Sequence, residues 1–173
     1  MLKLNLFVDF NQEISIIFNI LLISSKKFEP APREVAIIDV HSRKILNWSL
    51  SNSMTAEWCA ELLQDTIDKY GKPEIHNSDQ GSQFTSEIYI DILKKHDIQI
   101  SMDGKGRALD NVYIERFWRS IKQEKIYLNP ANGGLELYHN VREYVDFYNS
   151  IRRHTEIGKV PPDEIYFKKQ MVG

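Results

Sequence analysis

The order of strand-like and helix-like patterns is the feature that most constrains how this chain folds. Two runs, 34–40 and 44–50, are rich in Val, Ile and Leu and are separated by the three residues "HSR". Such a pair is typical of an antiparallel β-hairpin. Helical patterns mixed with short strands follow, and the last third of the chain is helical. At 173 residues, the chain is long enough for one ordinary domain with a real core.

Several elements after the hairpin have recognisable ends. A helix is predicted over 55–71, because Thr55 suits an N-cap, apolar residues recur at helical spacing and Gly71 suits a stop. Cys59, in this helix, is the single cysteine of the chain, which excludes a disulfide framework, and it is expected to fill the core. The other predicted elements are strands at 73–78 and 98–102 and helices from about 86, over 112–127, and after 134 with a stripe of Leu135, Tyr138, Val141, Val145 and Tyr148.

The apolar run "ISIIFNILLI" at 14–23 is the main feature near the N-terminus. It is too short to span a bilayer. Asp9 and Glu13 stand where a secretory signal carries positive charge, so no such signal is expected. We interpret the run as a buried strand or a damaged segment, and we expect a cytoplasmic protein with no membrane partner.

The charge is small overall but uneven along the chain. The formal net charge is −2 and the pI about 6.2, which argues against coating nucleic acid by bulk charge. The first 92 residues carry 8 Lys and Arg against 13 Asp and Glu, whereas the rest carry 14 against 11. Contacts with a polyanion are therefore expected in the second half. Near its end, Arg152 and Arg153 lie in a basic turn that is able to touch phosphate.

Two carboxylates stand at positions suited to metal chemistry. Asp79, in "HNSDQGSQFTS", follows a predicted strand, and Glu115 lies 35 intervening residues later in the first turns of a predicted helix. A strand end and a helix can meet at the rim of a sheet, where two carboxylates hold hard cations such as Mg²⁺ or Mn²⁺. A third carboxylate is expected in such a site. The alternative is a turn-opening aspartate and a solvated glutamate.

A polar stripe on the 112–127 helix extends this prediction. Its members share one face at helical spacing: Asn111, Glu115, Arg119 and Lys122. Lys105 and Arg107 on the preceding glycine-bearing loop add cationic reach toward the same groove, so Lys105, Arg107, Arg119 and Lys122 are predicted to contact phosphates. The alternative is a salt bridge between Glu115 and Arg119.

Four motifs in order make the chain similar to a known family. They are "IIDVHSRKILNWSLS", "HNSDQGSQFTS", "ALDNVYIERFWRSIKQE" and "YNSIRRHTEIGKVPPDE". From about Glu34 to Tyr166 the chain resembles the integrase-core transposases of bacterial insertion sequences, relatives of retroviral integrases. The resemblance implies an α/β, RNase H-like fold, with a central mixed sheet flanked by helices. It also implies a metal-dependent site of Asp, Asp and Glu, of which Asp79 and Glu115 match the second and third.

The first carboxylate of that site has no match. Residues 1–34 contain no Trp-x-x-Asp-Ile-Thr string, Asp39 matches a strand-end aspartate outside the triad, and Asn19 is near the expected place but carries no charge. One hypothesis is a reading frame that shifts after Gln12 and returns before about Val35. Translating the other two frames over codons 12–34 tests it, since a Trp-x-x-Asp-Ile-Thr string there supports the shift and its absence rejects it.

The resemblance implies cleavage and joining of DNA at the ends of an insertion sequence, and it suggests that Arg119 and Lys122 face the DNA. Because the first carboxylate has no match, we predict that this chain is impaired. The resemblance divides the chain into an atypical segment 1–33, a core 34–167 and a tail 168–173. Partners implied are DNA and either further copies of the chain or an intact transposase. Two alternatives stay open, namely a nuclease of the same fold and a non-catalytic remnant that binds DNA or transposase.

Overall fold

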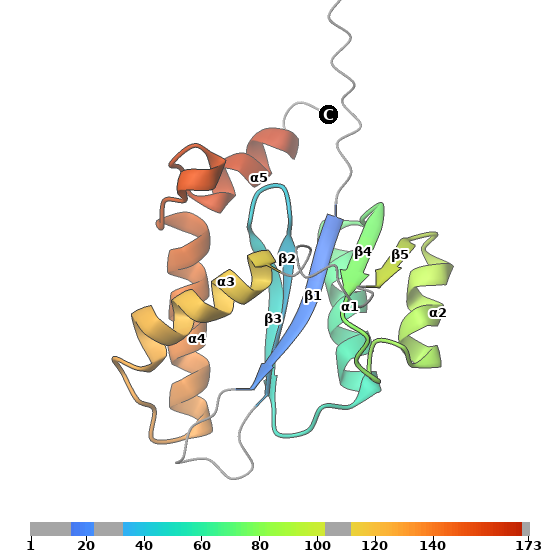
Figure 1. The fold of residues 1–173 in the computed structure, drawn as a ribbon, viewed down its shortest axis with the longest axis horizontal. Helices are drawn as coiled ribbons and strands as arrows, with labels where there is room; N and C mark the ends of the chain where they lie inside the picture. Colours follow the sequence, from blue (N-terminus) through green and yellow to red (C-terminus); the bar gives the residue numbers. More distant parts are fainter. Residues whose placement is uncertain (1–14, 23–32, 103–111, 171–173) are drawn as a thin grey trace, which may run out of the picture.

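The computed structural model describes residues 15–22, 33–102 and 112–170, and its centre is a five-stranded sheet (Figure 1). The strand order is β3-β2-β1-β4-β5, so the first strand lies in the middle. Strand β2 pairs antiparallel with both β1 and β3, whereas β4 pairs parallel with both β1 and β5. The strands are β1 Ser15–Leu22, β2 Arg33–Asp39, β3 Ile45–Ser51, β4 Ile75–Ser78 and β5 Gln99–Met102.

The N-terminal apolar run forms the central strand, which confirms the prediction of a strand there. Strand β1 pairs with β2 from Ile16 opposite Asp39 to Leu22 opposite Arg33. Its first half also pairs with β4. A central strand has helices over both faces, which suits a continuous run of Ile, Leu and Phe. Residues 15–22 therefore complete the same sheet to which the predicted 34–167 core contributes.

Helices cover both faces of the sheet, as the sequence predicted. They are α1 Ala56–Tyr70, α2 Glu87–Lys95, α3 Val112–Ile121, α4 Gly134–Ser150 and α5 Pro162–Gln170. Strand β2 separates two cores, because Val35 and Ile37 pack with α1 and α2, whereas Ala36 and Ile38 pack with α3 and α4. This alternation is the two-residue period of a strand buried on both faces.

Helix α1 has the ends that the sequence predicts. The Thr55 hydroxyl accepts a hydrogen bond from the Trp58 N–H at 3.2 Å, and Gly71 ends the helix at a φ of 85°. Both features satisfy backbone groups that a helix end leaves unpaired. Cys59 is fully buried in the core beneath this helix, as expected of a small apolar side chain.

The long predicted helix over 112–127 changes its winding. Helix α3 ends at Ile121, and a π-helix, η1, continues over Lys122–Ile126. The Tyr127 N–H donates to the Lys122 carbonyl at 2.9 Å, a bond to the fifth preceding residue. This wider turn lets Ile126 reach the core that α3 and α4 share.

Two predicted buried stripes are partly wrong. For the helix from about 86, helical spacing predicts a buried stripe of Ile88, Ile92 and Leu93. In α2, Ile88 is 45% exposed, whereas Tyr89 and Leu93 are buried. In α4, Leu135 and Tyr138 are exposed, and the buried stripe is Leu137, Val141, Tyr144, Val145 and Tyr148. The predicted and the observed α4 stripes share Val141, Val145 and Tyr148. Periodicity alone therefore does not decide which side of the first turn of α4 meets the sheet.

The chain after α4 turns back toward the sheet. His154 and Val160 form an isolated antiparallel bridge around a short 3-10 helix, Thr155–Ile157, and α5 follows. None of the described helices is both long and apolar enough to cross a membrane.

Candidate active site

Asp79 lies directly after β4, in the turn that leads to α2. Its Oδ1 accepts the Gly81 N–H at 2.8 Å, and the side chain is half-buried. A Cβ at Gly81 would lie 2.9 Å from that oxygen and 2.2 Å from the Gln83 amide nitrogen. A larger residue at this position would displace the ends of the Gln83 and Asp79 side chains, and the Gly81 N–H holds one oxygen of Asp79.

Extending the β1–β4 register by one residue brings Asn19 level with Asp79. In the parallel pairing of β1 with β4, Phe18 is opposite Ser78. Asn19 and Asp79 are the next residues along these two neighbouring segments. On its other side, Asn19 pairs with Ala36 of β2. The position next to Asp79 on the central strand is thus occupied by an amide rather than a carboxylate.

Glu115 is in the first turns of α3, which packs across β1 and β2 (Figure 1). It is exposed, as is Arg119 one turn later. Within the described part of the chain, neither side chain forms an ion pair, so the alternative of a Glu115–Arg119 salt bridge is wrong. Both groups are available to ligands on the solvent side of α3.

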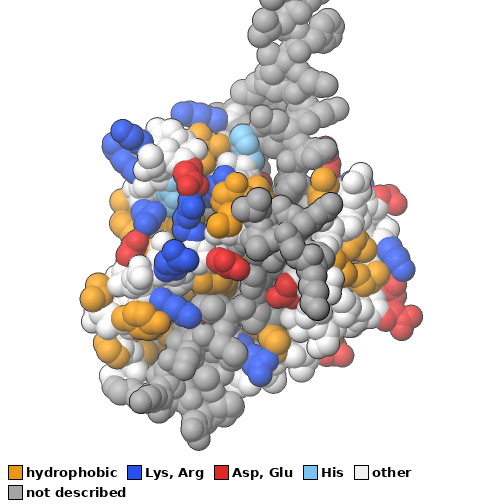
Figure 2. Space-filling view, viewed as in Figure 1, with side chains coloured by type: hydrophobic (Ala, Val, Ile, Leu, Met, Phe, Trp, Pro, Cys, Tyr) orange, Lys and Arg blue, Asp and Glu red, His pale blue; other side chains and the backbone are white. Residues whose placement is uncertain are grey.

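The structure describes two of the four cations that were predicted to contact DNA. Arg119 and the half-buried Lys122 follow Glu115 along α3 and into η1. Lys105 and Arg107, and with them Asn111, lie outside the described residues. Figure 2 shows Lys and Arg side chains gathered over the half of this face that α3 and α4 occupy. The opposite half carries more Asp and Glu.

A buried acid near Lys122 escaped the sequence analysis. Glu34 is 1% exposed at the start of β2, and neither of its carboxylate oxygens has a hydrogen-bond partner within the described ranges. Burial raises the pKa of Glu34 to about 8, and the positive charge of Lys122 opposes this rise in part. At neutral pH Glu34 is mostly protonated, so it adds no ionised carboxylate. The sequence did not indicate this burial, because Glu34 stands at the end of a polar segment, residues 26–34.

The residues present do not fit a complete two-metal centre. Among the side chains that the structure describes, no three His, Cys, Asp or Glu residues gather closely enough to hold a metal ion. Asp79 and Glu115 supply the two carboxylates that the sequence predicted, and Asn19 supplies no charge. Two divalent ions close together require more negative charge than this set provides.

The tail motif has a structural role that its sequence did not reveal. Asn149 is buried and bonds to the edge strand, and Tyr148 packs edge-on against Phe117 of α3. Arg152 forms two hydrogen bonds to Glu124, at 2.7 and 3.1 Å, and these bonds lower the pKa of that carboxyl. Arg152, one of the two expected phosphate contacts, is thus paired within the chain.

Sequence comparisons identify the integrase core and insertion-sequence transposases. Two family models, each described as Integrase core domain, match residues 28–108 and 96–162. The putative transposase InsK for insertion sequence element IS150 of Escherichia coli is 33% identical over 130 residues, which is 74% of this chain and 46% of the relative. The transposase InsF for insertion sequence IS3A of E. coli is 33% identical over 131 residues, or 74% and 46%. The chain spans about half the length of these relatives.

Solved integrase structures share the fold. The catalytic core domain of BIV integrase superposes with a TM-score of 0.74 at 16% identity, covering 92% of this chain and 97% of that one. The catalytic core domain of HTLV-2 integrase in complex with magnesium gives 0.69 at 16% identity, covering 89% and 96%. The strand order and the helices on both faces therefore define an RNase H-like protein, as predicted. With four motifs, two family models and these relatives in agreement, the chain belongs to the integrase core family of insertion-sequence transposases.

Proposed function

We propose that this chain binds DNA as the integrase core of an insertion-sequence transposase, and that its cleavage and joining of DNA strands are impaired. The relatives named as transposases support the first part, because the resemblance extends over both carboxylate motifs. The second part concerns the residues of this chain alone.

One observation carries the proposed impairment, namely the position of Asn19 beside Asp79. A neutral amide binds a divalent ion more weakly than a carboxylate and neutralises none of its charge. Among the described residues, Asp79 and Glu115 are the carboxylates assigned to the proposed site, so a divalent ion is held weakly there. A magnesium or manganese ion remains the group that would activate the phosphodiester.

DNA is the proposed partner, and the solvent side of α3 is its proposed contact. Arg119 is exposed and free of ion pairs among the described residues, and Lys122 lies one turn further on. Phosphate contacts of this kind position DNA without reading its sequence. Lys105 and Arg107 are proposed to add to this contact. Assembly with further copies, or with an intact transposase, remains part of the proposal.

A strand-transfer assay with a restored carboxylate tests the proposal. Purified wild type and Asn19→Asp are incubated with labelled element-end DNA and Mg²⁺ or Mn²⁺, and cleaved and joined products are measured. Asn19→Asp is expected to gain product over the wild type, and Asn19→Asp combined with Asp79→Asn is expected to lose the gain. Efficient metal-dependent strand transfer by the wild type contradicts the impairment.

The same assay separates the two alternatives. Hydrolysed ends without joined strands in Asn19→Asp indicate a nuclease of the same fold. Salt-sensitive DNA binding with no metal-dependent product in either form indicates a binding remnant.

A further inference from the structure

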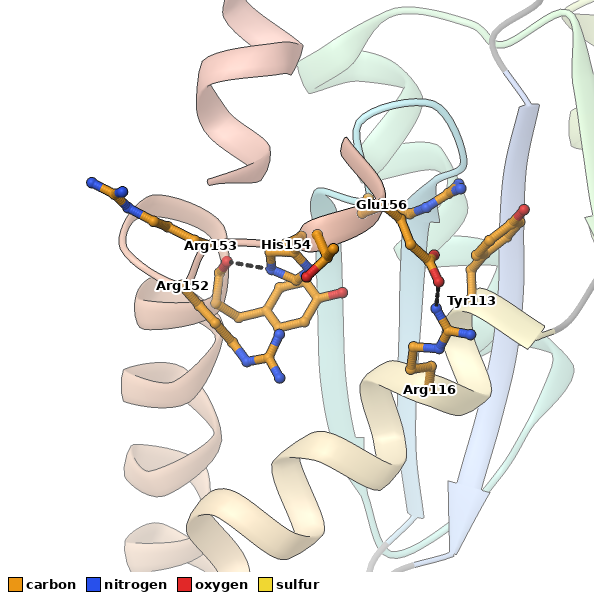
Figure 3. Close-up of a pocket in the computed structure, with 9 residues that line it drawn as sticks. Tyr113, Arg116, Arg152, Arg153, His154 and Glu156 are labelled. Carbon is orange, nitrogen blue, oxygen red and sulfur yellow. Dashed lines mark hydrogen bonds and ion pairs between the residues drawn. The ribbon is translucent and has the colours of Figure 1, made fainter. Parts of the chain in front are cut away.

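A second polar feature lies next to α3, on the side away from Glu115. It is a cavity of about 270 Å³ between the β2–β3 turn, the start of α3 and the chain after α4 (Figure 3). Four arginines line it, one or two from each segment: Arg43, Arg116, Arg152 and Arg153. Glu156 is the one carboxylate among its lining residues. We call it the arginine pocket.

The arginine pocket contains a guanidinium with two unpaired nitrogens. Nε and Nη1 of Arg43 are buried, and neither has a hydrogen-bond partner among the residues that the structure describes. Its Cζ lies 3.4 Å from the centroid of the Tyr113 ring, so the aromatic face covers one side of the cation. Buried charged donors normally have acceptors, and their absence indicates a ligand that supplies them.

The β2–β3 turn holds Arg43 in this position. Its φ is 67°, in the left-handed region that non-glycine residues rarely adopt. The Arg43 N–H donates to the Asp39 carbonyl at 2.8 Å, and the Asp39 carboxylate accepts the Ser42 N–H at 2.9 Å. This places Asp39 at a strand end, as the sequence predicted. A fixed, unfavourable backbone that presents an unpaired cation is a feature of binding sites.

The remaining charges show which ligand the arginine pocket favours. Arg116 is paired with Glu156 (Figure 3). Arg152 is paired with Glu124. In Figure 3, Arg153 extends away from the other labelled side chains. Burial and the nearby Arg152 lower the pKa of His154, so this ring is neutral at pH 7. The lining is therefore positive, and its unmatched donors suit phosphate oxygens.

We propose that the arginine pocket holds a backbone phosphate of DNA bound across α3. The proposal rests on the DNA-binding function proposed above. Arg116 follows Glu115 directly, about 100° further around the helix, so the two flanks of one helix carry the candidate site and the pocket. A cavity just below the usual 300 Å³ or more of ligand pockets admits one phosphate with part of its sugar.

Two variants with opposite expected effects test the proposal. Arg43→Asn keeps a residue that tolerates the left-handed region and removes the guanidinium. Glu156→Gln removes the carboxylate that occupies Arg116. Binding of a fluorescent DNA duplex is measured by anisotropy between about 50 and about 200 mM salt, a range over which phosphate contacts make affinity strongly salt-dependent. Arg142→Gln, an exposed arginine of α4 outside the pocket, is the matched control.

Loss of one phosphate contact has a defined signature. Arg43→Asn is expected to weaken binding roughly tenfold and to lower the slope of log K against log salt by about 0.9. Glu156→Gln is expected to tighten binding several-fold, and Arg142→Gln to change neither quantity. Circular dichroism melts verify that each variant is folded.

Other outcomes overturn the proposal in distinguishable ways. If wild type binds DNA with a salt-dependent affinity that Arg43→Asn and Glu156→Gln leave unchanged, the pocket assignment is wrong and the proposed function stands. If wild type shows no salt-dependent DNA binding, both fail. Inorganic phosphate is also added to wild type and to Arg43→Asn. If it raises the melting temperature of the wild type but not of Arg43→Asn, and the two bind DNA equally well, the pocket binds free phosphate instead.

Discussion

Asn149 of α4 completes the hydrogen bonding of Ile45 at the start of the edge strand β3. Its Oδ1 accepts the Ile45 N–H at 2.9 Å, and its Nδ2 donates to the Ile45 carbonyl at 2.9 Å. The side-chain amide thus replaces the neighbouring strand that an edge strand lacks. Through this contact the tail motif is joined to the sheet.

Asn149→Ala is expected to lower the free energy of unfolding by about 2–4 kcal/mol, because two bonds are lost and buried backbone groups remain unpaired. Chemical denaturation measures the change. The control is Asn140→Ala on the same helix, which loses one bond near the surface and is expected to cost less than about 1 kcal/mol. Equal effects of the two variants would show that the Ile45 contact has no special weight.

Gly81 and Gly134 form a matched pair for testing the Asp79 turn. Alanine at Gly81 would press on Gln83 and on Asp79 Oδ1, whereas alanine at Gly134 would meet nothing within 4 Å. We expect Gly81→Ala to destabilise the chain by about 1–3 kcal/mol. Gly134→Ala, in the first turn of α4, is expected to be neutral or to stabilise by up to about 1 kcal/mol. Thermal melts distinguish the two, and a neutral Gly81→Ala would mean that the turn adapts freely.

Glu34 predicts an unusual dependence of stability on pH. Its pKa is about 8 in the folded chain and near the ordinary value of 4.5 in the unfolded chain. Between pH 4.5 and 8, the folded state therefore retains a proton that the unfolded state loses. The free energy of unfolding therefore falls as pH rises from about 4.5 to 8, by on the order of 4 kcal/mol in total.

Glu34→Gln is expected to abolish this fall in the free energy of unfolding. Urea denaturation above pH 6.5 measures the difference between the variant and the wild type most clearly. Glu61→Gln, at an exposed position of α1, serves as the control and should keep the wild-type slope. A slope that persists in Glu34→Gln would assign the effect to another group.

His76 predicts the opposite slope in acid. It is fully buried on β4, its Nε2 is 3.0 Å from the Tyr89 hydroxyl, and burial lowers its pKa from 6.5 to about 3. The unfolded state binds a proton there that the folded state does not, so stability is lost as pH falls from about 6.5 to 3. Nitrogen NMR of labelled histidine should find this imidazole neutral at pH 5 in the folded chain, and a charged ring would contradict its burial.

Local patterns predicted much of the fold because they are set by neighbouring residues. The hairpin, the caps of α1 at Thr55 and Gly71, and the apolar run that became β1 each follow from a short stretch of sequence. The π-turn after Ile121 and the exposure of Leu135 depend on how α3 and α4 meet. Packing between distant segments decides such features, and periodicity does not report it.

The candidate site likewise contains features that local sequence predicts and features that depend on the fold. Asp79 and Glu115 were found by motif and spacing, and the turn of Asp79 follows from its own glycine. The adjacency of Asn19 to Asp79 requires the parallel pairing of β1 with β4. The arginine pocket requires residue 43, the start of α3 and residues 152–156 to meet, and no pattern in one segment indicates that meeting.

Manganese binding by titration calorimetry, with Asn19→Asp against wild type, tests the central claim most directly. If residues 19, 79 and 115 converge on one ion, adding a carboxylate at position 19 should tighten Mn²⁺ binding by about tenfold or more, which corresponds to at least about 1.4 kcal/mol. The gain should vanish when Glu115→Gln is added to Asn19→Asp. Equal Mn²⁺ affinities of wild type and Asn19→Asp would contradict the account.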